Sequence, residues 1–357
     1  MSDAASRPLP EDDRQAVEHL VQGYHKIREE MAKVIIGQEV VLEQMLICLL
    51  AGGHAILEGV PGLAKTLMVR ALSRSLSLSF RRIQFTPDLM PGDITGTEVL
   101  EENRATGARE ARFLKGPIFA NVVLADEINR TPPKTQAALL EAMQEKQVTA
   151  GGQRYELPRP FFVLATQNPI EQEGTYPLPE AQADRFMFKI RVSYPSYDEE
   201  FQIMQLTAEE PWHDITPVLG AEEILELQEI VRRVPIADYV VDYAMRLARA
   251  TRGDGSAPPF VQEWVRWGIG PRACQHMIRA AKARALLRER CHVSVEDIQA
   301  AAAPVMRHRL VTTFTAASDN VTPGEVVEAL IEHIPAREGP LSEDESVQEV
   351  LGPGGPQ

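Results

Sequence analysis

One octapeptide, GVPGLAKT at residues 59–66, constrains this chain more than any other stretch of it. It stands between a short apolar run that ends at Leu57 and a segment from Leu67 onward with helical spacing. A strand, a glycine-bearing loop, Lys-Thr and a helix form the context that a phosphate-binding loop requires, because backbone N–H groups and the positive end of the helix then face one anion. The pattern G-x-x-x-x-G-K-[ST] has Gly where this chain has Ala64. A turn that only joins strand to helix is the alternative, and the loop by itself leaves it open.

Five polar residues would carry the chemistry of such a site. Lys65 can reach the β- and γ-phosphates of a nucleotide, and the Thr66 hydroxyl can hold Mg²⁺. An apolar run ends in two adjacent carboxylates, Asp126 and Glu127, and paired acids are seldom buried without cations. We expect Asp126 to bind Mg²⁺ directly or through water and Glu127 to polarise the attacking water, whereas simple helix capping is the alternative. Asn168 closes the next apolar strand and can orient that water or sense the γ-phosphate.

Three arginines are candidates for contact with transition-state charge. Such a cation is worth roughly 10³–10⁵ in rate when it acts as an arginine finger. Arg185 precedes the last predicted strand, Arg272 starts a helix of the second domain, and Arg130 closely follows the two acids. One can come from a neighbouring subunit and another from a mobile lid. The alternative for Arg185 and Arg272 is a surface ion pair, worth about 0–1 kcal/mol.

Short apolar runs alternate with helical stretches in the first half of the chain, which predicts a mostly parallel sheet with helices on both faces. Ligands of such sheets bind beyond the carboxyl ends of the strands. The expected strands are 55–57, 82–85, 122–125, 161–166 and 187–190, and the expected helices start near Lys65, Gly116, Pro132 and Leu178. A long Gly-containing stretch (88–115) and a hairpin (147–157) interrupt the alternation, and long loops of this kind are functional or disordered.

The 357 residues favour two domains. We expect a disordered N-terminus at 1–11, a nucleotide domain at 12–195, a connector at 196–220, an all-helical lid at 221–335 and a flexible tail at 336–357. No run approaches the roughly 18 apolar residues of a membrane span, and the N-terminus has no signal-peptide core. Three scattered cysteines indicate a reducing cytoplasm. A formal charge of −14 disfavours a nucleic-acid footprint over the whole surface.

Five motifs, GVPGLAKT, VVLADEINR, ATQN, LPEAQADRF and GPRA, together resemble those of the MoxR family of AAA+ ATPases, over residues 12–335. The resemblance implies an αβα P-loop domain with a parallel five-stranded sheet, a small all-α lid, ATP and Mg²⁺ as ligands, and a hexameric ring. It assigns Ala64 as a recurrent variant of Walker A, Asp126 and Glu127 to Walker B, and Asn168 and Arg272 to sensors 1 and 2. The implied nucleotide-binding residues are Gly59, Val60, Pro61, Gly62, Leu63, Ala64, Lys65, Thr66 and Leu67, with Ile36 and Gly37 at the adenine.

The same resemblance extends to the arginine finger and the insertions. Arg185 matches the finger of the related magnesium chelatase and minichromosome maintenance ATPases. The stretch 88–115 matches the helix-2 insert, and 147–157 matches the pre-sensor-1 hairpin. MoxR-like proteins are thought to be chaperones that assemble or activate partner complexes, often with metal insertion, and the partners commonly carry a von Willebrand factor A domain.

Three other functions stay open. A nucleic-acid motor would use basic residues of the insertions (Arg104, Arg109, Arg112, Lys115, Arg154 and Arg159), but acids are mixed among them and the chain is acidic. A motor subunit of a chelatase would insert metal into a tetrapyrrole. A nucleotide-binding scaffold without hydrolysis is disfavoured, because Glu127, Asn168 and Arg185 are all present.

Overall fold

The computed structural model describes residues 11–102, 109–171, 174–209, 214–253 and 257–336. These residues form two compact units. The larger unit comprises the described residues of Pro8–Val234 together with Lys282–His292, and the smaller comprises those of Pro235–Ala281 and Val293–Gln357. Within the described residues, no helix combines the length and the apolar character needed to cross a membrane.

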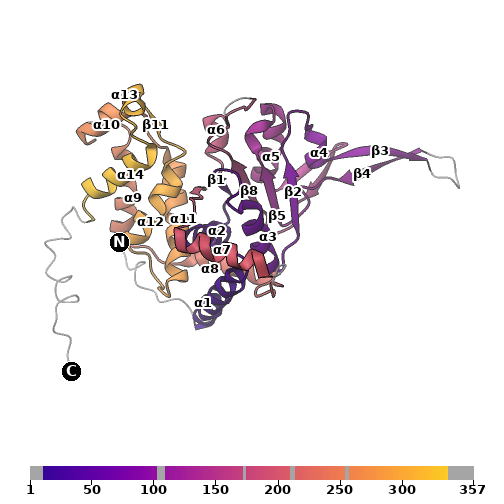
Figure 1. Cartoon of the computed structure of the whole chain (residues 1–357), viewed down its shortest axis with the longest axis horizontal. Coiled ribbons are helices and arrows are strands. Elements are labelled where there is room, and N and C mark those ends of the chain that lie inside the picture. Colours follow the sequence, from indigo (N-terminus) through magenta and orange to yellow (C-terminus); the bar gives the residue numbers. More distant parts are fainter. Residues whose placement is uncertain (1–10, 103–108, 172–173, 210–213, 254–256, 337–357) are drawn as a thin grey trace. The chain divides into compact units, whose positions relative to one another are not determined.

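A five-stranded parallel sheet in the order β2-β5-β8-β1-β9 is the centre of the larger unit (Figure 1). Its strands are β1 (Ala55–Glu58), β2 (Phe80–Gln84), β5 (Val122–Asp126), β8 (Phe162–Gln167) and β9 (Phe188–Arg191). All five predicted strands are confirmed, with ends shifted by one or two residues. Every residue of β5 is buried, which is why this strand reads as a continuous apolar run.

Helices cover both faces of this sheet, as predicted. Val123 and Ala125 of β5 pack in one buried cluster with Leu139 and Met143 of helix α5. Since side chains alternate along a strand, the other residues of β5 face the opposite layer. The helices of the larger unit are α1 (Glu11–Ala32), α2 (Glu39–Leu50), α3 (Lys65–Ser75), α4 (Pro91–Thr95), η1 (Ile128–Arg130), α5 (Pro133–Glu145), α6 (Glu180–Ala183), α7 (Tyr197–Glu209) and α8 (Ala221–Arg233). Helix α8 packs with α1 and α2.

The helix expected near Gly116 is wrong. Only six residues separate the end of β4 (Arg109–Lys115) from β5, and they form a turn. The backbone N–H groups of Gly116 and Ile118 donate to the carbonyls of Thr95 and Ile94, so the donors of this turn are used by the end of α4. A Cβ on Gly116 would lie 2.3 Å from the Ile94 carbonyl oxygen, which explains the glycine.

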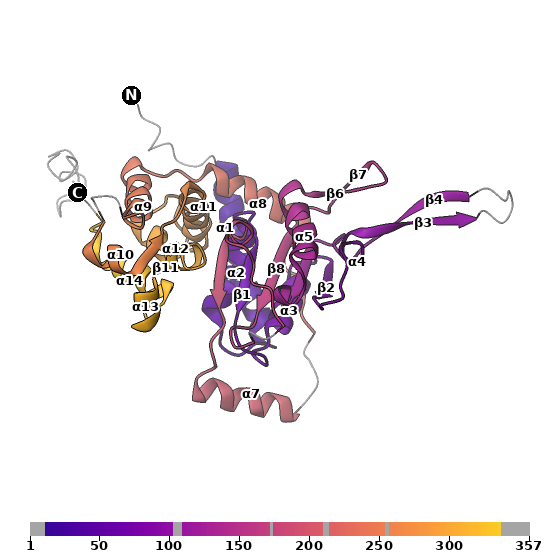
Figure 2. The same cartoon turned by 90° about the horizontal axis from the view of Figure 1, so that it is seen from above.

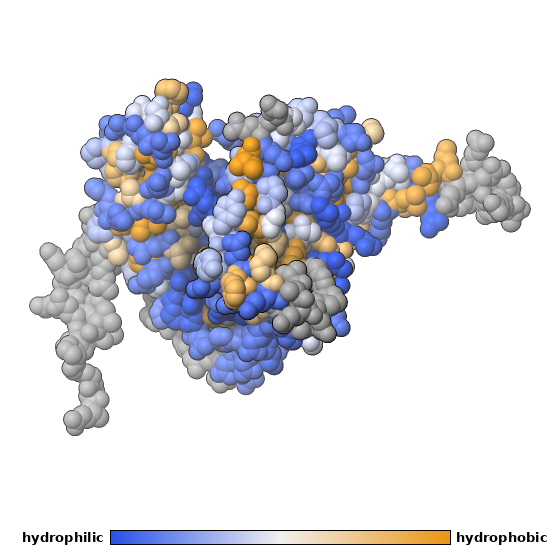
Figure 3. All heavy atoms as spheres, viewed as in Figure 1, coloured by the Kyte–Doolittle hydropathy of each residue, from blue (hydrophilic) through white to orange (hydrophobic). Residues whose placement is uncertain are grey.

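Two antiparallel hairpins extend from the sheet domain. The first pairs β3 (Gly96–Glu102) with β4 and forms a long arm (Figures 1 and 2). The second, β6 (Gln147–Ala150) with β7 (Gln153–Glu156), confirms the predicted hairpin, and Gly151 and Gly152 supply the positive φ of its turn. The rings of Phe113 and Tyr155 stack with centroids 4.3 Å apart and join the two hairpins. Hydrophobic side chains are visible along the arm in Figure 3. Leu100 of β3 is 71% exposed.

The smaller unit is helical apart from one short sheet. It contains α9 (Asp238–Ala250), α10 (Pro259–Trp264), the start of α11 (Pro271–Leu287), α12 (Val295–Met306), α13 (Phe314–Ser318) and α14 (Pro323–His333). Strands β10 (Val265–Trp267) and β11 (Val311–Thr312) pair antiparallel, a detail that the sequence did not predict. Asp297 accepts hydrogen bonds from the Ser294 backbone N–H and hydroxyl, so the Ser-x-x-Asp spacing, which is typical of a capping box, forms one at the start of α12. Of the expected tail at 336–357, all but residue 336 lies outside the described residues.

Candidate functional site

The loop between β1 and α3 turns through two residues with positive φ. Gly62 has φ 87°, and Ala64, the N-cap of α3, has φ 53° and ψ 21°, in the left-handed region. This region favours glycine, because a Cβ there crowds the following carbonyl oxygen. The departure from the phosphate-loop pattern at position 64 is therefore a side-chain change within an unchanged backbone conformation.

Gly59 is required by packing. A Cβ at this position would lie 2.7 Å from the Val192 carbonyl oxygen, just beyond β9. The Gly59 N–H donates to the carbonyl of Gln167 at 3.2 Å, at the end of β8. The loop thus leaves the sheet between the ends of the two strands that flank β1.

The Lys65 ammonium lies over the loop. Its Nζ donates to the carbonyl oxygens of Gly59 and Val60, the second at 2.9 Å. Partial burial lowers the pKa of Lys65, and the nearby charges of Asp126 and Glu127 oppose that shift. The cation is held where it can exchange two carbonyls for phosphate oxygens.

A pocket of about 430 Å³ opens in front of this loop, at the carboxyl ends of the strands. It is lined by residues of four elements and their following loops, namely Pro61, Gly62, Leu63, Ala64, Lys65, Thr66, Leu67, Arg82, Asp126, Glu127, Thr166, Gln167 and Asn168. Most of the predicted phosphate-loop, metal and sensor residues are therefore brought together. Arg82, Thr166 and Gln167 were not predicted as site residues.

Asp126 is 8% exposed, and its carboxylate accepts three hydrogen bonds from neighbouring side chains. Its Oδ1 accepts a hydrogen bond from the Thr166 hydroxyl at 2.6 Å. Its Oδ2 accepts two from the Arg82 guanidinium, at 2.8 Å from Nε and 2.6 Å from Nη2. The Thr166 hydroxyl in turn accepts from the Glu127 backbone N–H at 2.7 Å, so one threonine fixes both acidic residues.

The Glu127 carboxylate faces a second cation and an amide. Its backbone is left-handed (φ 57°, ψ 48°), which turns the side chain out of the strand direction. Oε2 accepts a hydrogen bond from Gln84 Nε2 at 2.9 Å and lies 3.1 Å from Arg130 Nε. Arg130 also pairs with Glu171. Arg130, one of the three candidate arginines, is thus an ion-pair partner of Glu127.

Asn168 presents a buried donor to the pocket. Its Oδ1 accepts from the Ile170 N–H at 3.3 Å, while its Nδ2, among the residues that the structure describes, has no hydrogen-bond partner. The side chain is only 6% exposed. An unpartnered buried N–H group costs about 1–3 kcal/mol, and a ligand oxygen in the pocket would satisfy it.

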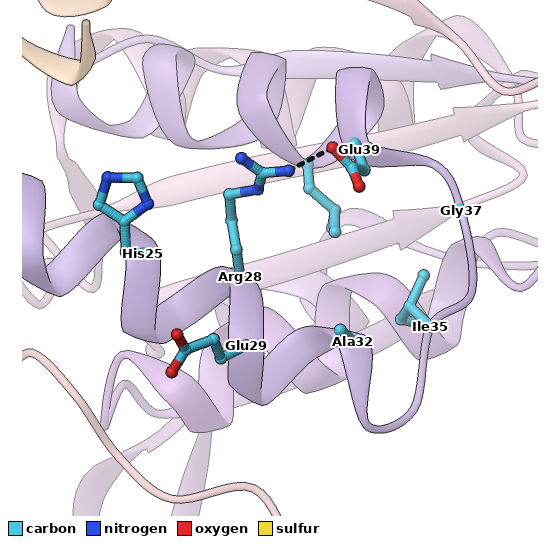
Figure 4. A pocket seen from close by; sticks show the side chains of 8 residues that line it. His25, Arg28, Glu29, Ala32, Ile35, Gly37 and Glu39 are labelled. Atoms are coloured by element: carbon cyan, nitrogen blue, oxygen red, sulfur yellow. Dashed lines mark hydrogen bonds and ion pairs between the residues drawn. The ribbon is translucent and has the colours of Figure 1, made fainter.

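Besides Gly59 and Val60 at the start of the loop, four predicted site residues do not line this pocket. Gly37 borders a separate cavity of about 290 Å³ between α1 and α2, and so does Ile35, the neighbour of the predicted Ile36. In this cavity Arg28 pairs with Glu39 (Figure 4). Arg185 precedes β9 and so lies at the amino ends of the strands. Arg272 lies in the first turn of α11, in the smaller unit.

The place of Arg82 in the pocket could not be predicted from the sequence alone. In the parallel register, Arg82 pairs with Leu124 and Gln84 with Asp126. Alternation along β2 therefore places the Arg82 and Gln84 side chains on one face, beside the end of β5. Only the order of the strands reveals that β2 and β5 are neighbours.

Two family models match the chain. One, described as "ATPase family associated with various cellular activities (AAA)", matches residues 54–188, and one described as "AAA lid domain" matches residues 260–330. The first match spans the loop, both carboxylates and Asn168.

Known proteins resemble the chain over most of its length. It is 45% identical to Chaperone MoxR1 of Mycobacterium tuberculosis over 306 residues, which cover 85% of this chain and 80% of the relative. It is 45% identical to the uncharacterized protein YeaC of Bacillus subtilis over 286 residues, 80% of this chain and 86% of that one. A solved structure of a protein assigned as an ATPase, from Cytophaga hutchinsonii, matches with a TM-score of 0.83 and 38% identity, and covers 91% of this chain and 98% of that chain.

Sequence, fold and pocket agree. Relatives at 45% identity match 85% and 80% of this chain, and the phosphate loop, the acidic pair and Asn168 meet at one edge of the sheet. This chain belongs to the MoxR family of AAA+ ATPases and is an ATP-hydrolysing enzyme.

Proposed function

We propose that the chain is an Mg²⁺-dependent ATPase that works as a homo-oligomeric ring, with hydrolysis coupled to chaperone-like assembly or activation of partner protein complexes. The observation that carries the catalytic part is the unpartnered Nδ2 of Asn168, which shares its pocket with Lys65 and two carboxylates. A buried donor beside a cation fits a bound phosphate group.

The residues present fit Mg²⁺. This ion keeps several waters and is held through one or two carboxylates together with substrate phosphates. Asp126 and Thr66 supply one carboxylate and one hydroxyl to the pocket. In the described part of the chain, no group of three or more His, Cys, Asp or Glu side chains could hold a metal, which suits a cation that arrives with its nucleotide. When bound, Mg²⁺ would neutralise phosphate charge.

The protein groups then have distinct roles in this proposal. Lys65 binds the phosphates, and Glu127 accepts a proton from the attacking water once its carboxylate is released from Gln84 and Arg130. Asn168 orients that water or contacts the γ-phosphate. Arg272 of the smaller unit is the proposed second sensor, and Ile36 and Gly37 the proposed adenine contacts.

Arg185 is proposed to act on a neighbouring subunit. The parallel strands put it at the edge of the sheet opposite to the pocket, so it cannot reach the phosphate loop of its own chain. Among the described residues, its guanidinium has no ion-pair partner. Both observations support a ring in which each site is completed by the adjoining copy, and a hexamer is the proposed size.

The chaperone role rests on the relatives. A protein 45% identical to this chain is called Chaperone MoxR1. We propose proteins with a von Willebrand factor A domain as clients, and metal insertion as one outcome of client activation.

The test is the Glu127→Gln variant. It keeps the size of the side chain but removes the proton acceptor, so turnover should fall about 10²–10⁴-fold while binding of a fluorescent ATP analogue is kept. Unchanged turnover would refute the assignment of Glu127 as the base.

The same variant tests the client hypothesis. Purified from its native cells in ATP, Glu127→Gln should retain partner proteins that ADP releases. Lys65→Ala is the matched control, because it should lose the nucleotide and retain none. Equal recovery of partners on both variants would contradict ATP-dependent client binding.

A further inference from the structure

Arg82 is the one pocket residue with a basic side chain that the catalytic roles above leave unused. It projects from β2 into the pocket, and its side chain is 49% exposed. The guanidinium donates two hydrogen bonds to one oxygen of Asp126, from Nε and Nη2. Arg81, the preceding residue of the same strand, points to the other face and is exposed.

The guanidinium also fixes the orientation of a neighbouring amide. Arg82 Nη2 donates to Gln84 Oε1. A guanidinium has donors only, so the oxygen of the Gln84 amide must face Arg82 and its NH₂ group must face away. That NH₂ group donates to Glu127 Oε2 at 2.9 Å. One continuous path of hydrogen bonds therefore runs from Asp126 through Arg82 and Gln84 to Glu127.

We propose that Arg82 is a positioning residue that links cation binding at Asp126 to the release of Glu127. The inference rests on the proposed Mg²⁺-dependent function. Arg82 occupies both acceptor positions of Asp126 Oδ2, whereas Thr166 occupies one position of Oδ1, so a cation or its water that binds through Oδ2 must displace Arg82.

Displacement of Arg82 acts on Glu127 through the amide. Once the guanidinium leaves, Gln84 Oε1 loses its donor and the amide is free to rotate. Glu127 Oε2 then loses the Gln84 N–H and keeps only its contact with Arg130, so one acceptor position becomes free for water. In the nucleotide-free state Arg82 keeps the base engaged, and cation entry removes that restraint.

The competition predicts how Mg²⁺ affinity responds to Arg82. A half-exposed pair of this kind is worth at most about 1 kcal/mol, which corresponds to about a fivefold change in an equilibrium constant. In the Arg82→Gln variant, the MgCl₂ concentration that gives half-maximal binding of a fluorescent ATP analogue should therefore fall, by up to about fivefold. Arg82→Lys keeps the charge but loses the planar fork, so a smaller decrease is expected.

Two further variants separate the competition from other effects. Arg81→Gln removes the same charge from the adjacent position on the opposite face, and its Mg²⁺ half-point should equal that of the wild type. Gln84→Ala leaves the contact between Arg82 and Asp126 in place, so its Mg²⁺ half-point should also be unchanged, while its kcat rises and its KM does not. Melting curves in EDTA check that each variant is folded. If Arg82→Gln does not fold, Arg82→Lys takes its place in the Mg²⁺ titration.

Several results would overturn the proposal. An unshifted Mg²⁺ half-point in Arg82→Gln or, if that variant does not fold, in Arg82→Lys would show that no competition exists. An equal shift of the Mg²⁺ half-point in Arg81→Gln would show that the loss of a nearby positive charge, and not the loss of the contact between Arg82 and Asp126, is the cause. More than tenfold weaker ATP binding at saturating Mg²⁺ would make Arg82 a phosphate ligand. Wild-type binding that ignores Mg²⁺ would refute the proposed Mg²⁺ dependence itself, whereas a Mg²⁺-dependent wild type with an unshifted Arg82→Gln refutes this inference alone.

Discussion

The left-handed backbone of the phosphate loop predicts opposite changes in stability for substitutions at two positions that are only two residues apart. Ala64 has φ 53°, a conformation that costs a non-glycine residue about 1–2 kcal/mol. Glycine would remove this cost, but its greater conformational freedom in the unfolded chain would lower the stability by about 0.4–1 kcal/mol. Ala64→Gly should therefore stabilise the larger unit by about 0.5 kcal/mol. Gly62→Ala, at φ 87°, should destabilise it by about the same amount, because its new Cβ would meet no atom within 4 Å and only the backbone conformation is penalised.

Thermal unfolding measures both changes. For a domain of this size, 1 kcal/mol corresponds to about 2–4 °C in Tm, so the two variants should differ by about 3 °C with opposite signs from the wild type. Gly152→Ala is the matched control, because it has φ 77° and equally open surroundings in the β6–β7 turn. It should lose stability as Gly62→Ala does and keep nucleotide affinity. A lower Tm for Ala64→Gly would refute the backbone explanation of the alanine.

Three further predictions concern the buried polar residues and the ring. Asn168→Ala should lower kcat about 10²-fold, as expected for one lost donor to the transition state, with nucleotide affinity changed only a few-fold; a kcat within threefold of the wild type would contradict the role of its Nδ2. Burial lowers the pKa of His54 to about 4, below its ordinary 6.5, so the unfolded chain binds the extra proton first. Stability is therefore complete above pH 6.5 and falls by up to about 3 kcal/mol towards pH 4, and urea unfolding of His54→Asn should show a flatter pH profile. Arg185→Ala should be inactive alone, but mixing it with Glu127→Gln should restore part of the turnover, since some interfaces then combine an intact base with an intact arginine; a mixture as inactive as its components would argue against action in trans.

The sequence predicted those parts of the fold whose signal is local. The five strands were visible because parallel strands buried on both faces are apolar along their whole length, as in β5. Lys65, Asp126 and Asn168 could be placed together because each follows a strand and all carboxyl ends of a parallel sheet meet at one edge. The Ser294–Asp297 cap needed only a spacing of three residues.

The rest depended on contacts that are distant in the sequence. The turn at Gly116 has an apolar, helix-compatible sequence, and only the carbonyls of α4 show why its donors are not used in a helix. Arg82 looks like an ordinary charged strand residue until β2 is placed beside β5. The antiparallel pair β10–β11 joins segments more than 40 residues apart, and two or three residues leave no readable period.

The stacked rings of Phe113 and Tyr155 have a mechanical consequence. Phe113 belongs to the β3–β4 arm and Tyr155 to the β6–β7 hairpin, so the stack is a contact through which movement of one hairpin can reach the other. Strand β6 follows α5 directly, and α5 begins three residues after Arg130, the ion-pair partner of Glu127. We therefore expect a force applied to the arm to reach the Glu127 carboxylate through α5. Tyr155→Ala should remove this path, and with it any change in the ATPase rate that binding at the arm produces.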